Sequence, residues 1–293
     1  MIPDSDDAWE VSPALIYASA GFVASLPDYL GMGTGPGPHP YMDVPSETSA
    51  TLDMLRAARQ FADQHQRRLA RSVLITGFSQ GAFPALGLAH VLGSGADPWF
   101  RVGAVAPISG PYHWSRWVHD VLAGLGTIDA KSATVYLAYL SVAWNRLHQL
   151  YASPSDWYQR PFDVDIETKM DGNHPVQEII GFLPGSPEEL LTTSAIAALE
   201  APSGRLASAF AVIDHTCQFA ATAPVRLFAA GGDPDVPIAN SQECRGQLAA
   251  RGAPVELVDV GQVDHLGSNV RGTANAVAWF IALRDRRVCS VDD

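Results

Sequence analysis

The most constraining feature of this chain is a strand that leads directly into a tight turn and then a helix. The apolar run Ser72–Thr76 is typical of a buried β-strand, and residues 80–92, rich in alanine and leucine, are typical of a helix. The sequence Gly-Phe-Ser-Gln-Gly at positions 77–81 lies at their junction and fits the pattern Gly-x-Ser-x-Gly. In this context the turn exposes the serine hydroxyl above the sheet, which predicts a nucleophile at Ser79. The alternative is an ordinary turn between a strand and a helix.

The rest of the chain alternates short apolar runs with amphipathic ones. This alternation predicts an α/β fold with a mostly parallel sheet flanked by helices. Further strands are expected at 21–26, 102–108, 225–230 and 255–260, and further helices at 8–20, 46–69, 240–251 and 272–283. The long helix carries apolar side chains at helical spacing, namely Leu52, Leu55, Ala58 and Phe61.

Residues 113–222 interrupt the alternation of strands and helices. They show helical periods, no clear strand, and four of the seven tryptophans. We therefore expect an α/β core made of residues 1–112 and 223–293, with residues 113–222 inserted as a helical cap or lid. Aromatic side chains of the cap can line a pocket, although packing of the cap helices is the favoured role for most of them. These residues are Trp114, Trp117, Tyr136, Tyr139, Trp144, Trp157 and Tyr158.

The composition limits the classes of partner. With 47% hydrophobic and 17% charged residues over 293 positions, the chain is typical of a globular protein with a sizeable core. A net charge of -12 argues against nucleic acid or an anionic membrane as the main partner.

No apolar run reaches the roughly 18 residues of an integral membrane segment. The acidic start lacks the features of a signal peptide, which predicts a cytoplasmic protein as written, or a secreted one if the N-terminus is truncated.

Three cysteines lie late in the chain, at Cys217, Cys244 and Cys289. No two of them form a Cys-x-x-Cys pair, so no zinc ribbon or thioredoxin-like motif is expected. A disulfide between Cys217 and Cys244 and free buried thiols fit the sequence equally well.

A serine nucleophile needs a base, and the base needs an orienting acid. For a serine on a turn of this kind, the partners follow in the order serine, acid, histidine. Of the nine histidines, His265 alone follows the final predicted strand, in a loop of small and polar residues before the last helix. We therefore expect His265 to be the base, and the alternative is a histidine of a surface loop.

Two aspartates compete for the role of the acid. Asp233 is the first acidic residue past the strand at 225–230, and Asp235 follows two positions later. Either can instead cap the next helix. Asp233 is favoured because a position at the strand end holds the carboxylate most rigidly. Asp264 is less suited, since adjacent residues rarely point their side chains at each other.

Stabilisation of a tetrahedral intermediate requires hydrogen-bond donors for its oxyanion. The backbone N–H of Gln80, at the start of a helix, is one expected donor. A second can come from the loop of residues 28–31, although a plain turn fits that spacing equally well.

Four sequence segments together resemble the secretory-lipase (lipase A-like) family of α/β-hydrolases. They are Pro-Asp-Tyr-Leu-Gly-Met-Gly at 27–33, Thr-Gly-Phe-Ser-Gln-Gly at 76–81, Gly-Asp-Pro-Asp-Val-Pro at 232–237 and Val-Asp-His at 263–265. The resemblance covers about residues 15–112 and 223–285, and it matches the cap only by position and helical character. In this family about three strands precede the helix expected at 8–20, so the chain resembles a form whose N-terminal strands are missing.

The resemblance implies an esterase or lipase with a lid, acting on a small-molecule or lipid ester without a metal or other cofactor. It implies a triad of Ser79, Asp233 and His265, with oxyanion donors from the backbone of Gln80 and Asp28. The alternatives are a peptidase or acyltransferase on the same triad, because a triad does not define its substrate, or an inactive binding protein.

Overall fold

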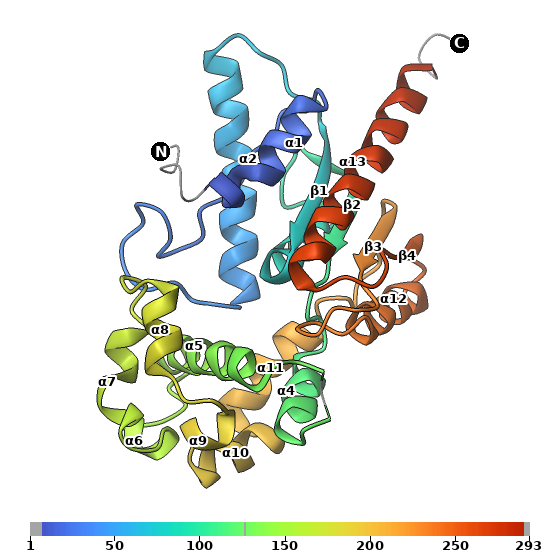
Figure 1. Ribbon diagram of the computed structural model, residues 1–293. Helices are drawn as coiled ribbons and strands as arrows, with labels where there is room; N and C mark the ends of the chain where they lie inside the picture. Colours follow the sequence, from blue (N-terminus) through green and yellow to red (C-terminus); the bar gives the residue numbers. More distant parts are fainter. Residues whose placement is uncertain (1–7, 126, 290–293) are drawn as a thin grey trace.

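The centre of the fold is a parallel β-sheet. The computed structural model describes residues 8–125 and 127–289, and within these residues the sheet has four strands in the order β1-β2-β3-β4 (Figure 1). They are β1 (Ser72–Phe78), β2 (Arg101–Ile108), β3 (Val225–Ala229) and β4 (Val255–Asp259). All neighbouring pairs are parallel. The predicted α/β class and the strands expected at these four places are confirmed.

The strands end at a common level, which places the residues that follow them at one edge of the sheet. Phe78 at the end of β1 pairs with Ile108 at the end of β2, and Ile108 in turn pairs with Phe228 near the end of β3. Ala229 pairs with Asp259, the last residue of β4. Ligand sites of open α/β sheets lie beyond the carboxyl ends of the strands, so this edge is the expected place for a site.

Helices cover both faces of the sheet. One apolar cluster joins α2 (Val44–Gln64), α3 (Ala82–Gly93) and α12 (Ala239–Ala250) to one face, with side chains such as Leu55, Phe83 and Leu248. A smaller cluster joins α1 (Ala8–Ser19) and α13 (His265–Cys289) to the other face through Tyr17 and Phe280. The layered α/β arrangement follows, because each sheet face buries its apolar side chains under helices.

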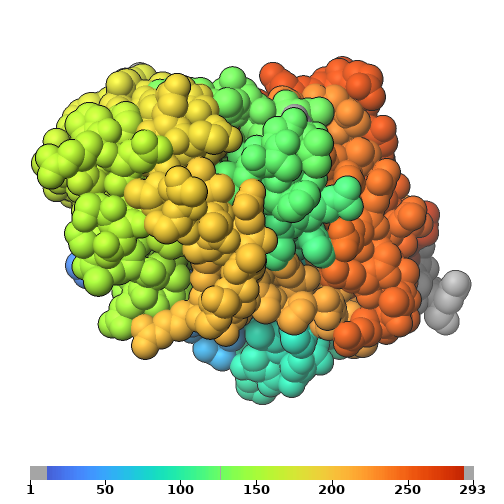
Figure 2. Space-filling model, turned by 90° about the horizontal axis from the view of Figure 1, so that it is seen from below, coloured from blue at the N-terminus to red at the C-terminus, as the bar shows by residue number. Residues whose placement is uncertain are grey.

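Residues 113–222 form only helices, turns and an isolated bridge within the described part, and we call them the helical segment. Their helices are α4 (Trp114–Leu122), α5 (Ala130–His148), α6 (Pro154–Trp157), α7 (Phe162–Lys169), α8 (Val176–Phe182), α9 (Pro187–Leu190), α10 (Thr193–Glu200) and α11 (Gly204–Asp214). They gather at the end of the sheet where β2 leads into them (Figure 1). Seen from below, the segment, coloured green to yellow-orange, covers most of the visible face (Figure 2). No single helix of the described residues is long and apolar enough to cross a membrane, and α10 and α11 reach that measure only as a pair bent by 49°.

The strand expected at 21–26 is absent, and that prediction was wrong. Phe22 and Ala24 pack against the cluster under α13, whereas Val23 is 77% exposed, so the side chains alternate as in a strand. A strand also needs backbone partners, and none of the described strands pairs with these residues. The N–H of Phe22 instead donates to the carbonyl of Tyr17.

Two helices also differ from expectation. In α2 the buried positions include Glu47, Thr51 and Leu55, while Phe61 is 64% exposed. The buried face of this helix is therefore rotated relative to the predicted one. The last helix, α13, begins at His265 and not near residue 272.

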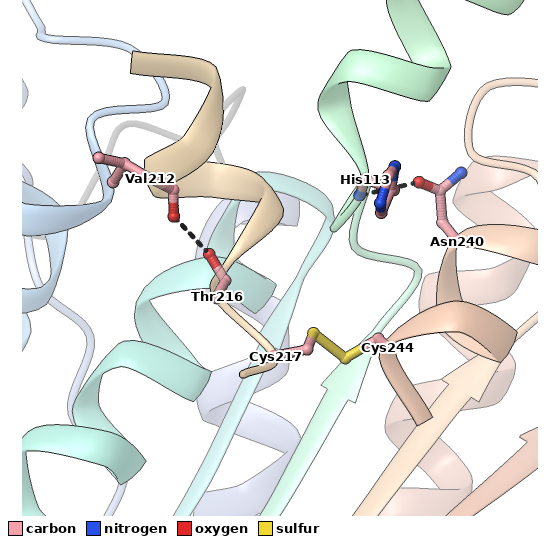
Figure 3. Close-up of a disulfide and its surroundings, with 6 residues drawn as sticks. All are labelled: His113, Val212, Thr216, Cys217, Asn240 and Cys244. Carbon is pink, nitrogen blue, oxygen red and sulfur yellow. Dashed lines mark hydrogen bonds between the residues drawn. A yellow bond between two sulfur atoms is a disulfide. The ribbon is translucent and has the colours of Figure 1, made fainter. Parts of the chain in front are cut away.

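A disulfide and a hydrogen bond attach both ends of the helical segment to α12 (Figure 3). Cys217, just after α11, is bonded to Cys244 of α12, which settles the pairing that the sequence left open. The backbone N–H of His113, just before α4, donates to Oδ1 of Asn240 over 3.2 Å. The side chain of Cys289 lies outside the described part.

Candidate active site

Ser79 sits on the turn that the Gly-x-Ser-x-Gly pattern predicts. It begins the short 3-10 turn Ser79–Gly81 between β1 and α3, and its φ angle is +54°. A non-glycine residue with positive φ is strained, and such strain is typical of a nucleophile held on a strand-to-helix turn. A Cβ atom at Gly77 would lie 2.0 Å from the carbonyl oxygen of Gly81, so the turn requires glycine there.

The structure brings Ser79, His265 and Asp233 together in one chain of hydrogen bonds. Nε2 of His265 lies 2.8 Å from Oγ of Ser79, and Nδ1 of His265 lies 2.7 Å from Oδ2 of Asp233. The three residues follow β1, β3 and β4, whose ends share one edge of the sheet. With a proton on Nδ1, Nε2 is free to accept the serine proton, which is the geometry of general-base catalysis.

Surrounding groups hold the acid and the histidine in place. Oδ1 of Asp233 accepts backbone N–H groups from Asp235 (3.0 Å) and Val236 (2.9 Å), and the carboxylate is fully buried. The ring of His265 packs on Phe78, with centroids 4.6 Å apart. These contacts leave each side chain a single orientation, which is what a preorganised site requires.

Asp235, the rival acid, points elsewhere. Its Oδ2 accepts a hydrogen bond from the hydroxyl of Tyr136 over 3.3 Å. Burial raises the pKa of the Asp235 carboxyl above its usual range; His265 opposes this shift, and the charge of Asp233 adds to it. The structure therefore places Asp233, and not Asp235, in contact with the histidine.

A small cavity of about 20 Å³ lies over Ser79 and His265. Its wall joins the core to the helical segment, and it consists of Tyr41, Met42, Ser79, Gln80, Pro111, Trp114, Trp117, Tyr136, Asp235, Val236 and His265. Three of the seven aromatic residues singled out in the sequence thus reach the cavity. Others, such as Trp144 and Tyr158, are fully buried in the packing of the helical segment.

The helical segment contacts the loop that carries the acid. The indole N–H of Trp117 donates to the carbonyl of Asp235 over 2.9 Å, and the rings of Trp114 and Trp117 stack with centroids 4.5 Å apart. The part of the cavity wall that Trp114 and Trp117 form therefore belongs to α4, and a hydrogen bond links it to Asp235, close to Asp233 in the sequence.

The two expected oxyanion donors differ in their surroundings. Gln80 lines the cavity beside Ser79. Asp28 is exposed and is not among the lining residues, whereas Tyr41 and Met42, later in the same segment, are. The roles of both backbone N–H groups stay predictions.

Sequence reasoning missed a buried polar cluster next to this site. Glu47 of α2 is completely buried, and desolvation raises the pKa of its carboxyl to about 8. Burial also lowers the pKa of His39. The available signal was a carboxyl at helical spacing with Thr51 and Leu55, on the face of α2 that packs inward. Within residues 8–125 and 127–289, no group of three or more His, Cys, Asp or Glu side chains is arranged to hold a metal ion.

Comparison with known proteins adds information on the fold. The chain matches no protein-family model and no curated protein sequence. Among solved structures, a Legionella pneumophila protein described as a candidate hydrolase has a TM-score of 0.83 at 26% identity, covering 92% of this chain and 73% of its own. The rice cell wall degrading esterase LipA from Xanthomonas oryzae has a TM-score of 0.77 at 24% identity, covering 88% and 69%. Lipase A from Candida antarctica has a TM-score of 0.55 at 14% identity, covering 78% and 51%.

These likenesses define the class of the protein. The chain has the α/β-hydrolase fold, in the form shared with LipA and with lipase A. The resemblance to lipase A-like α/β-hydrolases that the motifs indicate is thus confirmed, at the level of the fold.

Proposed function

We propose that the protein is a serine hydrolase that cleaves carboxylic esters, with Ser79 as nucleophile, His265 as base and Asp233 as the orienting acid. The observation that carries this proposal is the unbroken run of two hydrogen bonds, 2.8 Å and 2.7 Å long, from Ser79 through His265 to Asp233. The esterase and lipase named among the structural neighbours support ester cleavage over other reactions of this fold.

The proposed reaction proceeds through an acyl-enzyme. His265 takes the proton of the Ser79 hydroxyl through Nε2 while Oγ attacks the ester carbonyl, and Asp233 stabilises the resulting imidazolium. The backbone N–H groups of Gln80 and Asp28 bind the oxyanion, and His265 returns its proton to the departing alcohol. Water, deprotonated by His265, then attacks the acyl-enzyme, and His265 returns this proton to Oγ of Ser79 as the carboxylic acid is released.

The helical segment acts as a lid in this proposal. A cavity of about 20 Å³ holds roughly one water molecule, which is far less than an ester requires. Substrate entry therefore requires α4 and its tryptophans to move away from Ser79. When the helical segment returns to its closed position, it also excludes bulk water from the site between turnovers.

Hydrolysis of a short p-nitrophenyl ester tests the proposal. Ser79→Ala should lose nearly all turnover and should no longer react with a fluorophosphonate probe, while the folded fraction stays unchanged. Ser94→Ala, at an exposed serine after α3, is the matched control and should behave as wild type. Undiminished hydrolysis by Ser79→Ala would refute the assignment of Ser79 as the nucleophile. A folded wild-type protein that neither reacts with the probe nor hydrolyses the ester would favour a binding role.

A further inference from the structure

The side chain of Gln80 enters a buried polar cluster that links three separate parts of the chain. Oε1 of Glu47, in the first turn of α2, accepts the backbone N–H of Met42 over 3.1 Å. The same oxygen accepts the amide N–H of Gln80 over 2.6 Å. The amide nitrogen of Gln80 also lies 2.8 Å from Nε2 of His39. We call Glu47, His39 and the Gln80 amide the Glu47 cluster.

The hydrogen bonds of the Glu47 cluster fix its protonation pattern. The amide nitrogen of Gln80 can only donate, so Nε2 of His39 must be the acceptor. The ring proton then lies on Nδ1, where it donates to the carbonyl of Leu30 over 3.0 Å. A neutral His39 agrees with the lowering of its pKa by burial. Both amide protons of Gln80 are thereby used, and the side chain has a single orientation.

The Glu47 cluster joins elements that the sheet does not connect. Gln80 belongs to the turn that carries Ser79, whereas Leu30, His39 and Met42 belong to the irregular segment before α2. Met42 and Gln80 both line the cavity over Ser79. The ring of Tyr29 stacks on His39 with centroids 5.9 Å apart, which adds a further contact between that segment and the cluster.

We propose that Glu47 is a positioning residue for catalysis, because its carboxyl, acting through the side chain of Gln80, sets the orientation of the turn that presents the Gln80 backbone N–H to the oxyanion. This inference rests on the proposed function. Oxyanion stabilisation depends on donors held in advance at about 3 Å from the developing charge, so a small rotation of this turn costs rate more than it costs substrate binding.

The charge state of Glu47 matters for the same reason. Its Oε2 has no hydrogen-bond partner in the described structure, and burial raises the pKa of the carboxyl to about 8. At pH 7 the carboxyl is therefore mostly protonated and places little negative charge behind the oxyanion. The titratable groups that face it are His39, Asp43, Tyr29 and Tyr41, and the charge of Asp43 adds to the rise in the pKa of Glu47. Ionisation of Glu47 above pH 8 would oppose charge development in the transition state.

Substitutions at Glu47 test this role with p-nitrophenyl acetate. Glu47→Ala removes the acceptor, and kcat should fall by about 10-fold to 100-fold while KM changes less than about threefold. Glu47→Gln keeps an oxygen for the N–H groups of Met42 and Gln80, and should retain most of the wild-type kcat at pH 7. Asp53→Asn, at an exposed carboxylate of the same helix, is the matched control and should leave kcat unchanged.

Two further readouts separate positioning from mere stability. The affinity for a trifluoromethyl ketone, which forms an anionic hemiketal with the serine, should weaken in Glu47→Ala by the same factor as kcat/KM. The wild-type kcat should decline above about pH 8, and Glu47→Gln should lack this decline. If folded Glu47→Ala keeps its kcat and its ketone affinity, or if Glu47→Gln retains the alkaline decline, the role of Glu47 is refuted.

The wild-type protein and Ser79→Ala distinguish failure of this inference from failure of the proposed function. An active wild-type protein that loses activity in Ser79→Ala, combined with an unaffected Glu47→Ala, refutes only the role of Glu47. A wild-type protein without Ser79-dependent hydrolysis refutes the function itself, and with it the inference that rests on it.

Discussion

Oδ2 of Asp233 lies 2.7 Å from Nδ1 of His265, while the carboxylate of Asp235, two residues further on, is bonded to Tyr136. The distinction arises from the backbone, because Oδ1 of Asp233 accepts the N–H groups of Asp235 and Val236 and thereby fixes the turn. One aspartate therefore faces the histidine, and the other faces the cavity wall.

Replacement of each aspartate by asparagine should separate their roles. Asp233→Asn places an amide beside Nδ1 and favours the wrong tautomer of His265, so kcat should fall by about 10⁴-fold. Asp235→Asn keeps the hydrogen bond to Tyr136 and should change kcat by less than about tenfold. Steady-state hydrolysis of p-nitrophenyl acetate measures both effects. A larger loss in Asp235→Asn than in Asp233→Asn would reverse the assignment of the acid.

Trp117 limits the size of the cavity. Replacing it with leucine removes part of the wall and the hydrogen bond to the carbonyl of Asp235. We expect the ratio of kcat/KM for a hexanoate ester to that for an acetate ester to rise by about tenfold, since each accommodated methylene is worth about 1 kcal/mol or more. Trp99→Leu, outside the cavity lining, is the control. An unchanged ratio would mean that the acyl chain lies elsewhere.

Local patterns were sufficient for the elements that build the edge of the sheet where Ser79, His265 and Asp233 meet. The apolar run of β1, the glycines around Ser79 and the polar residues after β3 and β4 each have a local signature, and the chain order of the triad then selected His265. The strand expected at 21–26 failed because strand formation requires a neighbouring backbone. Its side-chain alternation carries no information about such a partner.

Contacts between residues distant in the sequence could not be predicted. Glu47 meets Gln80, 33 positions later, and His39 meets Gln80 across 41 positions. A buried glutamate in the first turn of a helix reads in sequence as an ordinary N-terminal acidic residue. Likewise, the spacing of Cys217 and Cys244 says nothing about their distance in space, and the disulfide emerges only once the fold brings the residues after α11 to α12.

The disulfide should contribute to stability by restricting the unfolded chain. It closes a loop over a sequence separation of 27, for which the chain-entropy relation gives about 3.5 kcal/mol. Cys217→Ser/Cys244→Ser should therefore lower Tm by roughly 10 °C in differential scanning calorimetry. A reductant should lower the wild-type Tm by a similar amount and leave that of the double variant unchanged. Equal Tm values with and without reductant in the wild type would contradict the prediction.

Glu47 should also make the stability of the protein depend on pH. The folded-state pKa of its carboxyl is raised by burial from 4.5 to about 8, so the folded state holds this proton more tightly than the unfolded state. The stabilising contribution of this proton is complete below about pH 4.5 and is lost as the pH rises through 8, because over this range the unfolded carboxyl ionises while the folded one keeps its proton. Glu47→Gln removes this titration. The Tm of the wild type minus that of Glu47→Gln should fall by roughly 5 °C between pH 5 and pH 9, with Asp53→Asn as control. A difference that stays constant over this range would show that the carboxyl does not titrate there.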